Sequence, residues 1–144
     1  MDLGTTFDAA VARQPNALAL VDGAIRRDFT SWQDDIRRIA GGLSVMGLKR
    51  DDRLVCVMAN RYEMAALYWA CQMLAAVFTP FNWRATADDV AFVLRDADPR
   101  LIAFDDAAGD SVLAALEGSG ISNDILISAG GGLARNQLCR SVEF

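Results

Sequence analysis

The stretch "LVCVMANRYEMAALYWACQMLAAVFTPFNWR", residues 54–84, contains the pattern that decides the fold. It begins with a continuously apolar run at residues 54–58 that is rich in β-branched side chains. Such a run predicts a parallel strand that is covered on both faces. Asn60, with a glutamate three positions later, predicts the start of a helix whose nearly unbroken apolar character makes it central. A short second strand, ending at Pro80, should complete a strand–helix–strand unit.

Upstream of this unit, the sequence predicts a hairpin and a short helix. Two strand-like runs within residues 17–30 flank Asp22-Gly23, a dipeptide that tolerates the positive φ angles of a tight turn. The preceding helix is expected over residues 5–13, with Thr5 or Thr6 as its cap.

The helix after the hairpin has clear signals at both ends. Thr30 and Gln33 have the spacing of a capping box, in which each side chain satisfies a backbone N–H of the other residue. Gly47 is the expected C-cap. The pair Gly41-Gly42 lies within the helix and is interpreted as allowing close packing. The apolar residues recur at helical spacing on one face: Trp32, Ile36, Ile39, Ala40, Leu43 and Met46.

Downstream of residue 84 the alternation of helix and strand continues. Thr86 is expected to cap a helix, and acidic residues in the first turn favour the same start. A buried strand at 100–104, a small helix at 110–116 and a strand at 124–128 should follow. The sequence therefore predicts an α/β fold with a largely parallel sheet, flanking helices and an N-terminal β-hairpin. Residues 1–128 are assigned to this domain and residues 129–144 to a loop or frayed tail.

The composition excludes several classes of function. The 144 residues contain no histidine, which excludes a Ser-His-Asp triad and any histidine metal ligand. The net charge is −5 with scattered arginines, so we expect no nucleic-acid partner. The longest apolar stretch is too short and too interrupted to predict a membrane span. The three cysteines, Cys56, Cys71 and Cys139, form no C-x-x-C pair. Two of them lie in apolar segments, where a reduced core thiol is expected, and this favours a cytoplasmic protein.

Few residues qualify as a site. The cluster Gly130–Gly132 lacks the lysine of a phosphate loop and is interpreted as a linker. Four pairs of adjacent aspartates stand at expected helix starts or turns, and no metal site is predicted from them. Asp105-Asp106 is the most interesting pair because it follows a strand end, where α/β folds place their sites. Of the three tryptophans only Trp83 looks exposed, so Asn82, Trp83 and Arg84 are the candidates for contact with a substrate or partner.

Residues 5–128 contain a series of short motifs whose order and spacing can be compared with those of known families. The residues that make up these motifs are Phe29-Thr30-Ser31-Trp32, Ala40, Leu43, Gly47, Lys49, Asp52, Arg53, Val55, Asn60, Pro80, Asn82, Arg84, Asp89, Val90, Phe92, Leu94 and Asp96. In this order and spacing the chain resembles the N-terminal portion of an acyl-CoA synthetase, a fatty-acid or aryl-acid CoA ligase of the adenylate-forming, AMP-binding superfamily. Two positions depart from the family pattern, since Asp51 and Ala75 stand where the family has glycine.

The resemblance implies a reaction that this chain cannot complete. Members of the family use ATP and Mg to convert a carboxylic acid into an acyl-adenylate and then transfer the acyl group to CoA. They do so with a phosphate loop ending in Pro-Lys and with a C-terminal lysine. The only lysine here, Lys49, lies in an early turn and does not match either motif. No catalytic or cofactor-binding residue can therefore be assigned, and ATP, Mg and CoA are implied only for a full-length parent enzyme.

Two interpretations follow from the sequence. In the first, the chain is the N-terminal structural part of an acyl-CoA synthetase, inactive alone, with the remainder of that enzyme as its partner. In the second, it is a stand-alone α/β binding or dimerisation module that has lost the chemistry, and the apolar faces are buried in a homodimer. A flavodoxin-like nucleotide binder has the right alternation but lacks a phosphate-binding turn.

Overall fold

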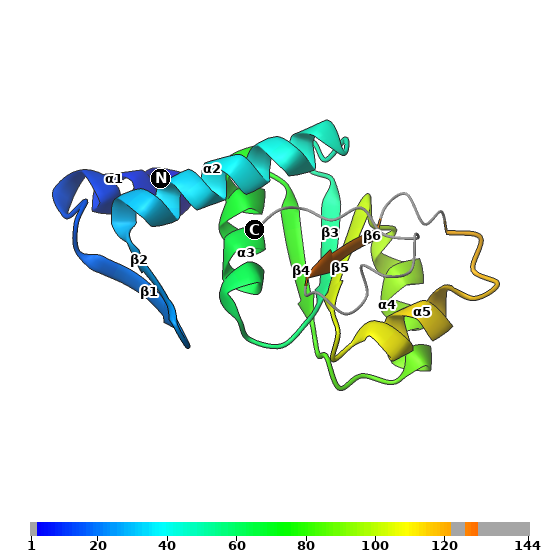
Figure 1. The fold of residues 1–144 in the computed structure, drawn as a ribbon. Coiled ribbons are helices and arrows are strands. Elements are labelled where there is room, and N and C mark those ends of the chain that lie inside the picture. The colour runs from blue at the N-terminus through cyan, green and yellow to red at the C-terminus, as the bar shows by residue number, and fades with distance from the viewer. Residues whose placement is uncertain (1–2, 122–125, 130–144) are drawn as a thin grey trace.

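The fold, seen in a computed structural model that describes residues 3–121 and 126–129, contains a hairpin and a separate four-stranded sheet (Figure 1). The hairpin is antiparallel and lies to one side, beyond α3 (Figure 1). The elements in chain order are α1 (Leu3–Arg13), β1 (Leu18–Asp22), β2 (Ile25–Asp28), α2 (Phe29–Val45), β3 (Arg53–Val57), α3 (Tyr62–Leu74), β4 (Val77–Phe81), α4 (Ala87–Ala97), β5 (Leu101–Asp105), α5 (Gly109–Leu116) and β6 (Leu126–Ala129).

The four-stranded sheet has the order β4-β3-β5-β6, and every neighbouring pair in it is parallel. The chain moves outward from β3 to β4, crosses back to β5 on the other side of β3, and continues to β6. This confirms the predicted α/β fold with a parallel sheet, flanking helices and an N-terminal hairpin. It also makes the gap between β3 and β5 the point at which the winding direction changes. In open α/β sheets, ligands bind beside the carboxyl ends of the strands at such a point.

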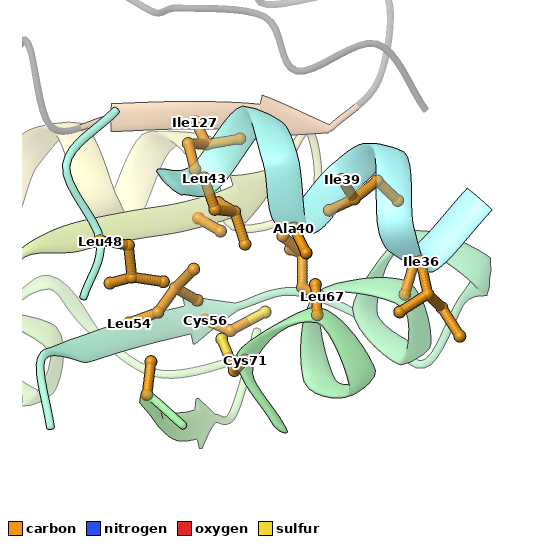
Figure 2. Packing of buried hydrophobic residues seen from close by; sticks show 14 of the residues in the cluster. Ile36, Ile39, Ala40, Leu43, Leu48, Leu54, Cys56, Leu67, Cys71 and Ile127 are labelled. Carbon is orange, nitrogen blue, oxygen red and sulfur yellow. The ribbon is translucent and has the colours of Figure 1, made fainter. Parts of the chain in front are cut away.

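Helices cover both faces of the sheet because successive strand side chains point to opposite sides. Leu54 and Cys56 of β3 belong to a core cluster with α2 and α3, whereas Val55 and Val57 pack in a second cluster with α4 and α5. Figure 2 shows the first cluster, in which Ala40 of α2 lies beside Leu67 of α3, and Cys56 of β3 lies beside Cys71 of α3. The continuous apolar run of β3 is therefore explained by burial on both faces.

Strand β4 forms one edge of the sheet and extends one residue beyond the predicted end at Pro80. The N–H of Val77 donates to the carbonyl of Asp52 at the start of β3, so the backbone groups of Val77 face inward. Alternation along the strand then places the backbone of Phe78 and Pro80 on the outer edge. Pro80 is tolerated within β4 because its missing N–H would have faced outward, the position in which sheets accept proline.

The predicted cap of α2 was wrong. The helix begins at Phe29, and the carboxylate of Asp28 accepts the N–H of Ser31 as the N-cap, at 2.8 Å. Thr30 lies inside the first turn, where its hydroxyl donates to the carbonyl of Pro15. Gln33 donates to Asp8 of α1. Both capping-box residues thus make tertiary hydrogen bonds, which local spacing does not reveal. The start of α1 was also predicted too late, since this helix begins at Leu3.

The start of α3 is capped from outside the helix. The sequence predicted Asn60, but the N-cap is Arg61, whose side chain makes no capping hydrogen bond. Instead the Tyr62 N–H donates to the carboxylate of Asp22 in the hairpin, at 2.7 Å. The side chain of Arg61 is held by Glu63 through two hydrogen bonds of 2.6 and 2.9 Å. A residue 40 positions away therefore satisfies one of the orphan donors of the helix.

The predicted end of α2 at Gly47 and the predicted N-cap of α4 at Thr86 are confirmed. Gly47 follows the α2 C-cap with φ +91°, and its N–H donates to Ser44 while the next N–H donates to Leu43, as in a Schellman motif. Thr86 caps α4 through reciprocal hydrogen bonds with Asp89, a complete capping box.

Gly41 does not allow close packing, contrary to the sequence interpretation. A Cβ atom placed there would meet no heavy atom within 4 Å, and the residue is exposed in the middle of α2. Gly41→Ala is therefore expected to stabilise the protein by about 0.5–1 kcal/mol, since alanine loses less backbone entropy on folding. Urea unfolding would measure this change. Gly47→Ala is the control of opposite sign because φ is positive at that position. An unchanged or lower stability of the Gly41 variant would contradict the argument.

The two departures from the family's glycines lie at positive φ. Ala75 has φ +53° as the C-cap of α3, and Asp51 has φ +66° in the turn before β3. A side chain with a Cβ atom is strained in this region, and aspartate tolerates it better than alanine. The family pattern thus marked positions where the backbone conformation favours glycine.

Replacing Ala75 with glycine should relieve this strain. We expect Ala75→Gly to raise the free energy of unfolding by about 0.5–1 kcal/mol, because the relief of the left-handed conformation exceeds the added backbone entropy cost. Ala65→Gly, inside the same helix, should instead destabilise by about 1 kcal/mol. Thermal unfolding of the two variants, compared with the parent chain, distinguishes the position effect from a general effect of glycine. Destabilisation by both substitutions would show that the left-handed backbone conformation of Ala75 is not strained.

A buried polar network joins the hairpin to α2 and α3. The carboxylate of Asp35, only 8% exposed, accepts hydrogen bonds of 2.6 Å from Tyr62 Oη, Arg27 Nε and Arg38 Nη2. Burial alone would raise the pKa of Asp35, but the hydrogen bonds from Tyr62 and Arg27 outweigh it and hold the pKa below its usual range. Burial, together with the Asp35 carboxylate, raises the pKa of Tyr62 to about 12. The network fixes the hairpin to the body of the domain.

Cys56 and Cys71 are buried free thiols, as predicted. Burial raises the pKa of both thiols, to about 12 for Cys71. They are side chains of the core and not nucleophiles. Cys139 lies outside the described residues, as does the predicted tail apart from Ala129, which ends β6.

Candidate functional site

The carboxyl edge of the sheet gathers polar side chains at the change of winding direction. Asp105 ends β5 and is 2% exposed. Its carboxylate accepts the N–H of Ala59, just after β3, at 3.0 Å, and that of Ala108 at 3.2 Å. Arg61 Nη1 lies 3.8 Å from Asp105 Oδ2. Asp105 therefore ties the end of β5 to the end of β3 and to the start of α5. Both carboxylate oxygens already have partners, which indicates a structural role.

The other aspartate pairs also divide between turns, caps and ion pairs. Asp34 is exposed and lies 3.8 Å from Arg37, whereas its neighbour Asp35 enters the buried network. Asp52 accepts the backbone N–H of Lys49 in a turn. Within residues 3–121 and 126–129 no group of three potential ligands is placed to hold a metal ion.

A groove runs between α3 and β4 and continues around the end of β4. It consists of two adjoining hollows of about 600 and 450 Å³ that share Asn60, Met64 and Pro80. We call it the α3–β4 groove. The first hollow is mostly apolar and is lined also by Arg61, Ala65, Tyr68, Trp69 and Phe78. The second is more polar and is lined also by Met58, Phe81, Asn82, Trp83 and Arg84.

The three candidate contact residues lie together in the second hollow. The carbonyl oxygen of the Asn82 side chain accepts the N–H of Arg84 at 3.0 Å, which closes the turn after β4. The guanidinium carbon of Arg84 stacks 3.9 Å from the centre of the Trp83 ring. Trp83 is half-buried against the core cluster of α4 and α5. The turn thus holds an exposed cation on a fixed aromatic platform.

The sequence missed the apolar half of the groove. It predicted the helix that follows Asn60 to be central and, of the three tryptophans, only Trp83 to be exposed. Instead, Trp69 is half-buried, and it contacts Tyr68 and Phe7, with ring centres 5.3 and 4.7 Å apart. Tyr68 also meets Phe78 of β4 edge-on at 5.6 Å. The helix is apolar nearly all round, which gave no sign of the open flank, since that flank results from the edge position of β4.

The described residues do not fit the nucleotide and metal chemistry of adenylate-forming enzymes. Lys49 lies before β3, at the amino end of the sheet, opposite the carboxyl end where the groove lies. The glycine cluster at 130–132 falls outside the described residues. In the part of the chain that the structure describes, no helix is long and apolar enough to span a membrane.

Comparison with known proteins identifies relatives among acyl-CoA ligases. The chain is 28% identical over 80 residues to the long-chain-fatty-acid–CoA ligase FadD13 of Mycobacterium tuberculosis, covering 56% of this chain and 16% of that protein. It is 33% identical over 91 residues to the mitochondrial medium-chain acyl-CoA ligase ACSF2 of Danio rerio, covering 62% of this chain and 15% of that protein. The chain therefore spans about one sixth of the length of these relatives.

Solved structures share the fold. A benzoate CoA ligase from Burkholderia xenovorans LB400 superposes with a TM-score of 0.82 at 18% identity, covering 90% of this chain and 26% of that one. The match falls on the N-terminal part of that enzyme. At this level of identity the likeness establishes the fold alone.

The sequence model of the family described as AMP-binding enzyme matches residues 7–140, which is nearly the whole chain. The match confirms the resemblance seen in the ordered short motifs. This chain belongs to the AMP-binding enzyme family.

Proposed function

We propose that this chain forms the N-terminal structural part of an acyl-CoA synthetase that activates a fatty or aryl carboxylic acid with ATP and transfers it to CoA. The family match over residues 7–140 carries the proposal. The relatives' names, which specify fatty-acid and medium-chain acyl-CoA ligases, support the substrate class. ATP, Mg and CoA would be bound by the rest of such an enzyme. The buried free thiols support a cytoplasmic location, because thiols stay reduced there.

In this proposal the domain contributes scaffold and not chemistry. Its buried carboxylates, those of Asp35 and Asp105, are engaged in internal hydrogen bonds. Its one lysine lies away from the groove. The sheet and the α3–β4 groove would then support the part of the polypeptide that holds the nucleotide and the acid.

The 144-residue chain alone is expected not to activate any acid. An ATP–pyrophosphate exchange assay with a panel of fatty and aryl acids should give only the background rate of a no-enzyme control. Clear acid-dependent exchange would disprove the scaffold role. The transcript downstream of the codon for Phe144 provides a second test. The proposal expects this part of the transcript to encode a Ser/Thr/Gly-rich loop that ends in Pro-Lys.

The alternative is a stand-alone binding or dimerisation module. The exposed apolar side chains Met73 of α3 and Val77 of β4, at 43% and 48% exposure, favour some covering partner. Size-exclusion chromatography with light scattering distinguishes the two. A discrete, concentration-independent dimer would support the module, whereas a monomer that binds apolar dyes would support an uncovered scaffold.

A further inference from the structure

The outer face of α4 exposes a large apolar side chain between two opposite charges. The helix packs on the sheet through Val90 and Leu94, which are buried in the second core cluster. On the opposite side Phe92 is 63% exposed, with Asp88 one turn before it and Arg95 one turn after it. Residues three and four apart are neighbours on a helix surface. Asp88, Phe92 and Arg95 therefore form one stripe, which we call the α4 stripe.

Neither charge of the α4 stripe is neutralised within the domain. In the part of the chain that the structure describes, Asp88 and Arg95 take part in no ion pair. Both line the same hollow, of about 270 Å³, beside the small side chains of Ala87 and Ala91. A second helix can therefore approach α4 closely here.

The helix dipole does not explain the whole α4 stripe. An aspartate in the first turn and an arginine in the last turn both complement the dipole, as Asp88 and Arg95 do. The dipole gives no reason for the exposed ring of Phe92 between them. Aromatic side chains are enriched at protein interfaces, where their apolar surface is removed from water. The combination favours contact with another molecule.

The α4 stripe is complementary to itself when two copies of α4 meet antiparallel. A two-fold interface brings the same surface of both copies together. With the two-fold axis beside Ala91 and Phe92, Asp88 of each copy lies opposite Arg95 of the other, and the two Phe92 rings meet at the centre. A parallel arrangement would instead place like charges opposite each other at both ends, which is unfavourable. The charge pattern thus selects a second copy of this chain and its orientation.

From these observations we infer that the α4 stripe is a self-association surface through which two copies of this chain form an antiparallel, two-fold dimer. A single pair of helices buries less area than the roughly 1,200–2,000 Å² of a standard stable interface, so the association is weak. We expect a Kd of about 10–100 μM, which leaves the chain monomeric at about 1 μM. The dimer is independent of the proposed function, because it needs neither a nucleotide nor any other polypeptide.

Sedimentation equilibrium of the 144-residue chain tests the inference, over concentrations from about 1 to about 500 μM that bracket the expected Kd. We expect a monomer–dimer equilibrium. Phe92→Ala and Arg95→Asp should each raise the Kd by about tenfold or more, since one removes the central ring and the other opposes like charges. The matched control is Arg13→Asp, at an exposed arginine in the last turn of α1, which should leave the Kd unchanged. Far-ultraviolet circular dichroism verifies that each variant is folded.

A mixing experiment tests the two-fold geometry. Asp88→Arg and Arg95→Asp should each prevent self-association, but an equimolar mixture of the two variants should form a heterodimer. One chain then presents two arginines and the other two aspartates, so both contacts are again between opposite charges. A parent chain that stays monomeric at the highest concentration, or a dimer whose Kd is unchanged by Arg95→Asp, would overturn the inference. A mixture that associates no better than its components would overturn the antiparallel pairing.

Discussion

Replacing Phe104 with alanine is expected to lower the free energy of unfolding by about 3–5 kcal/mol, the usual cost of removing a buried aromatic ring. Phe104 lies in β5 with no exposed surface, opposite Val57 of β3, in the core cluster beneath α4 and α5. Truncation removes apolar burial and leaves a cavity that strands paired on both sides cannot collapse to fill. Urea unfolding followed by far-ultraviolet circular dichroism measures the change as a shift of the midpoint.

Phe92→Ala makes the same chemical change at an exposed position. Phe92 lies on the outer face of α4 at 63% exposure, so its truncation should change the stability by no more than about 0.5 kcal/mol. Comparable losses at both positions would mean that β5 does not form the centre of the sheet. For a domain whose total stability is about 5–15 kcal/mol, the Phe104 variant should be close to unfolding.

Asp35→Ala is expected to cost about 2–4 kcal/mol, because it leaves the Tyr62 hydroxyl and the Arg27 guanidinium without their buried acceptor. The neighbouring Asp34→Ala is the matched control. Its side chain is 69% exposed and lies 3.8 Å from Arg37, so the loss should be no more than about 0.5 kcal/mol. Equal effects at the two positions in urea unfolding would argue against the network.

The pH dependence of the Asp35 effect gives an independent measurement. Because the folded-state pKa of Asp35 is lowered, its contribution is fully present above the ordinary value of about 3.9 and is lost as pH falls through the lowered pKa. The difference in stability between the parent chain and Asp35→Ala should therefore be constant from pH 5 to 7 and should narrow below about pH 4. A difference that grows on acidification would have the wrong sign.

Local sequence patterns were reliable where the interacting groups are close in the chain. Thr86 and Asp89 form their capping box within one turn, and Gly47 ends α2 because the backbone there needs a positive φ. The same reasoning failed for Thr30 and Gln33, whose side chains bond to Pro15 and Asp8. It failed again at α3, since Asp22 from the hairpin takes the role expected of Asn60.

The same distinction applies to the candidate site, because some of its residues could be selected from local sequence patterns and others could not. Asn82, Trp83 and Arg84 could be selected from the sequence because a polar turn after an apolar run is exposed, and the structure places them together. Tyr68, Trp69 and Phe78 could not be recognised as groove residues. Apolar residues in a helix and a strand look the same in sequence whether a neighbour covers them or not.

The sequence by itself determined the order of helices and strands, the parallel sheet and the family, because hydrophobic periodicity and short motifs are local properties of the chain. Only the tertiary structure decided which strand lies at the edge, which carboxylates are buried, and where a groove opens. Those features depend on which distant segments meet. The order β4-β3-β5-β6 leaves the flank of α3 open, and the docking of the hairpin turns Asp35 from a helix-surface residue into the centre of a buried network.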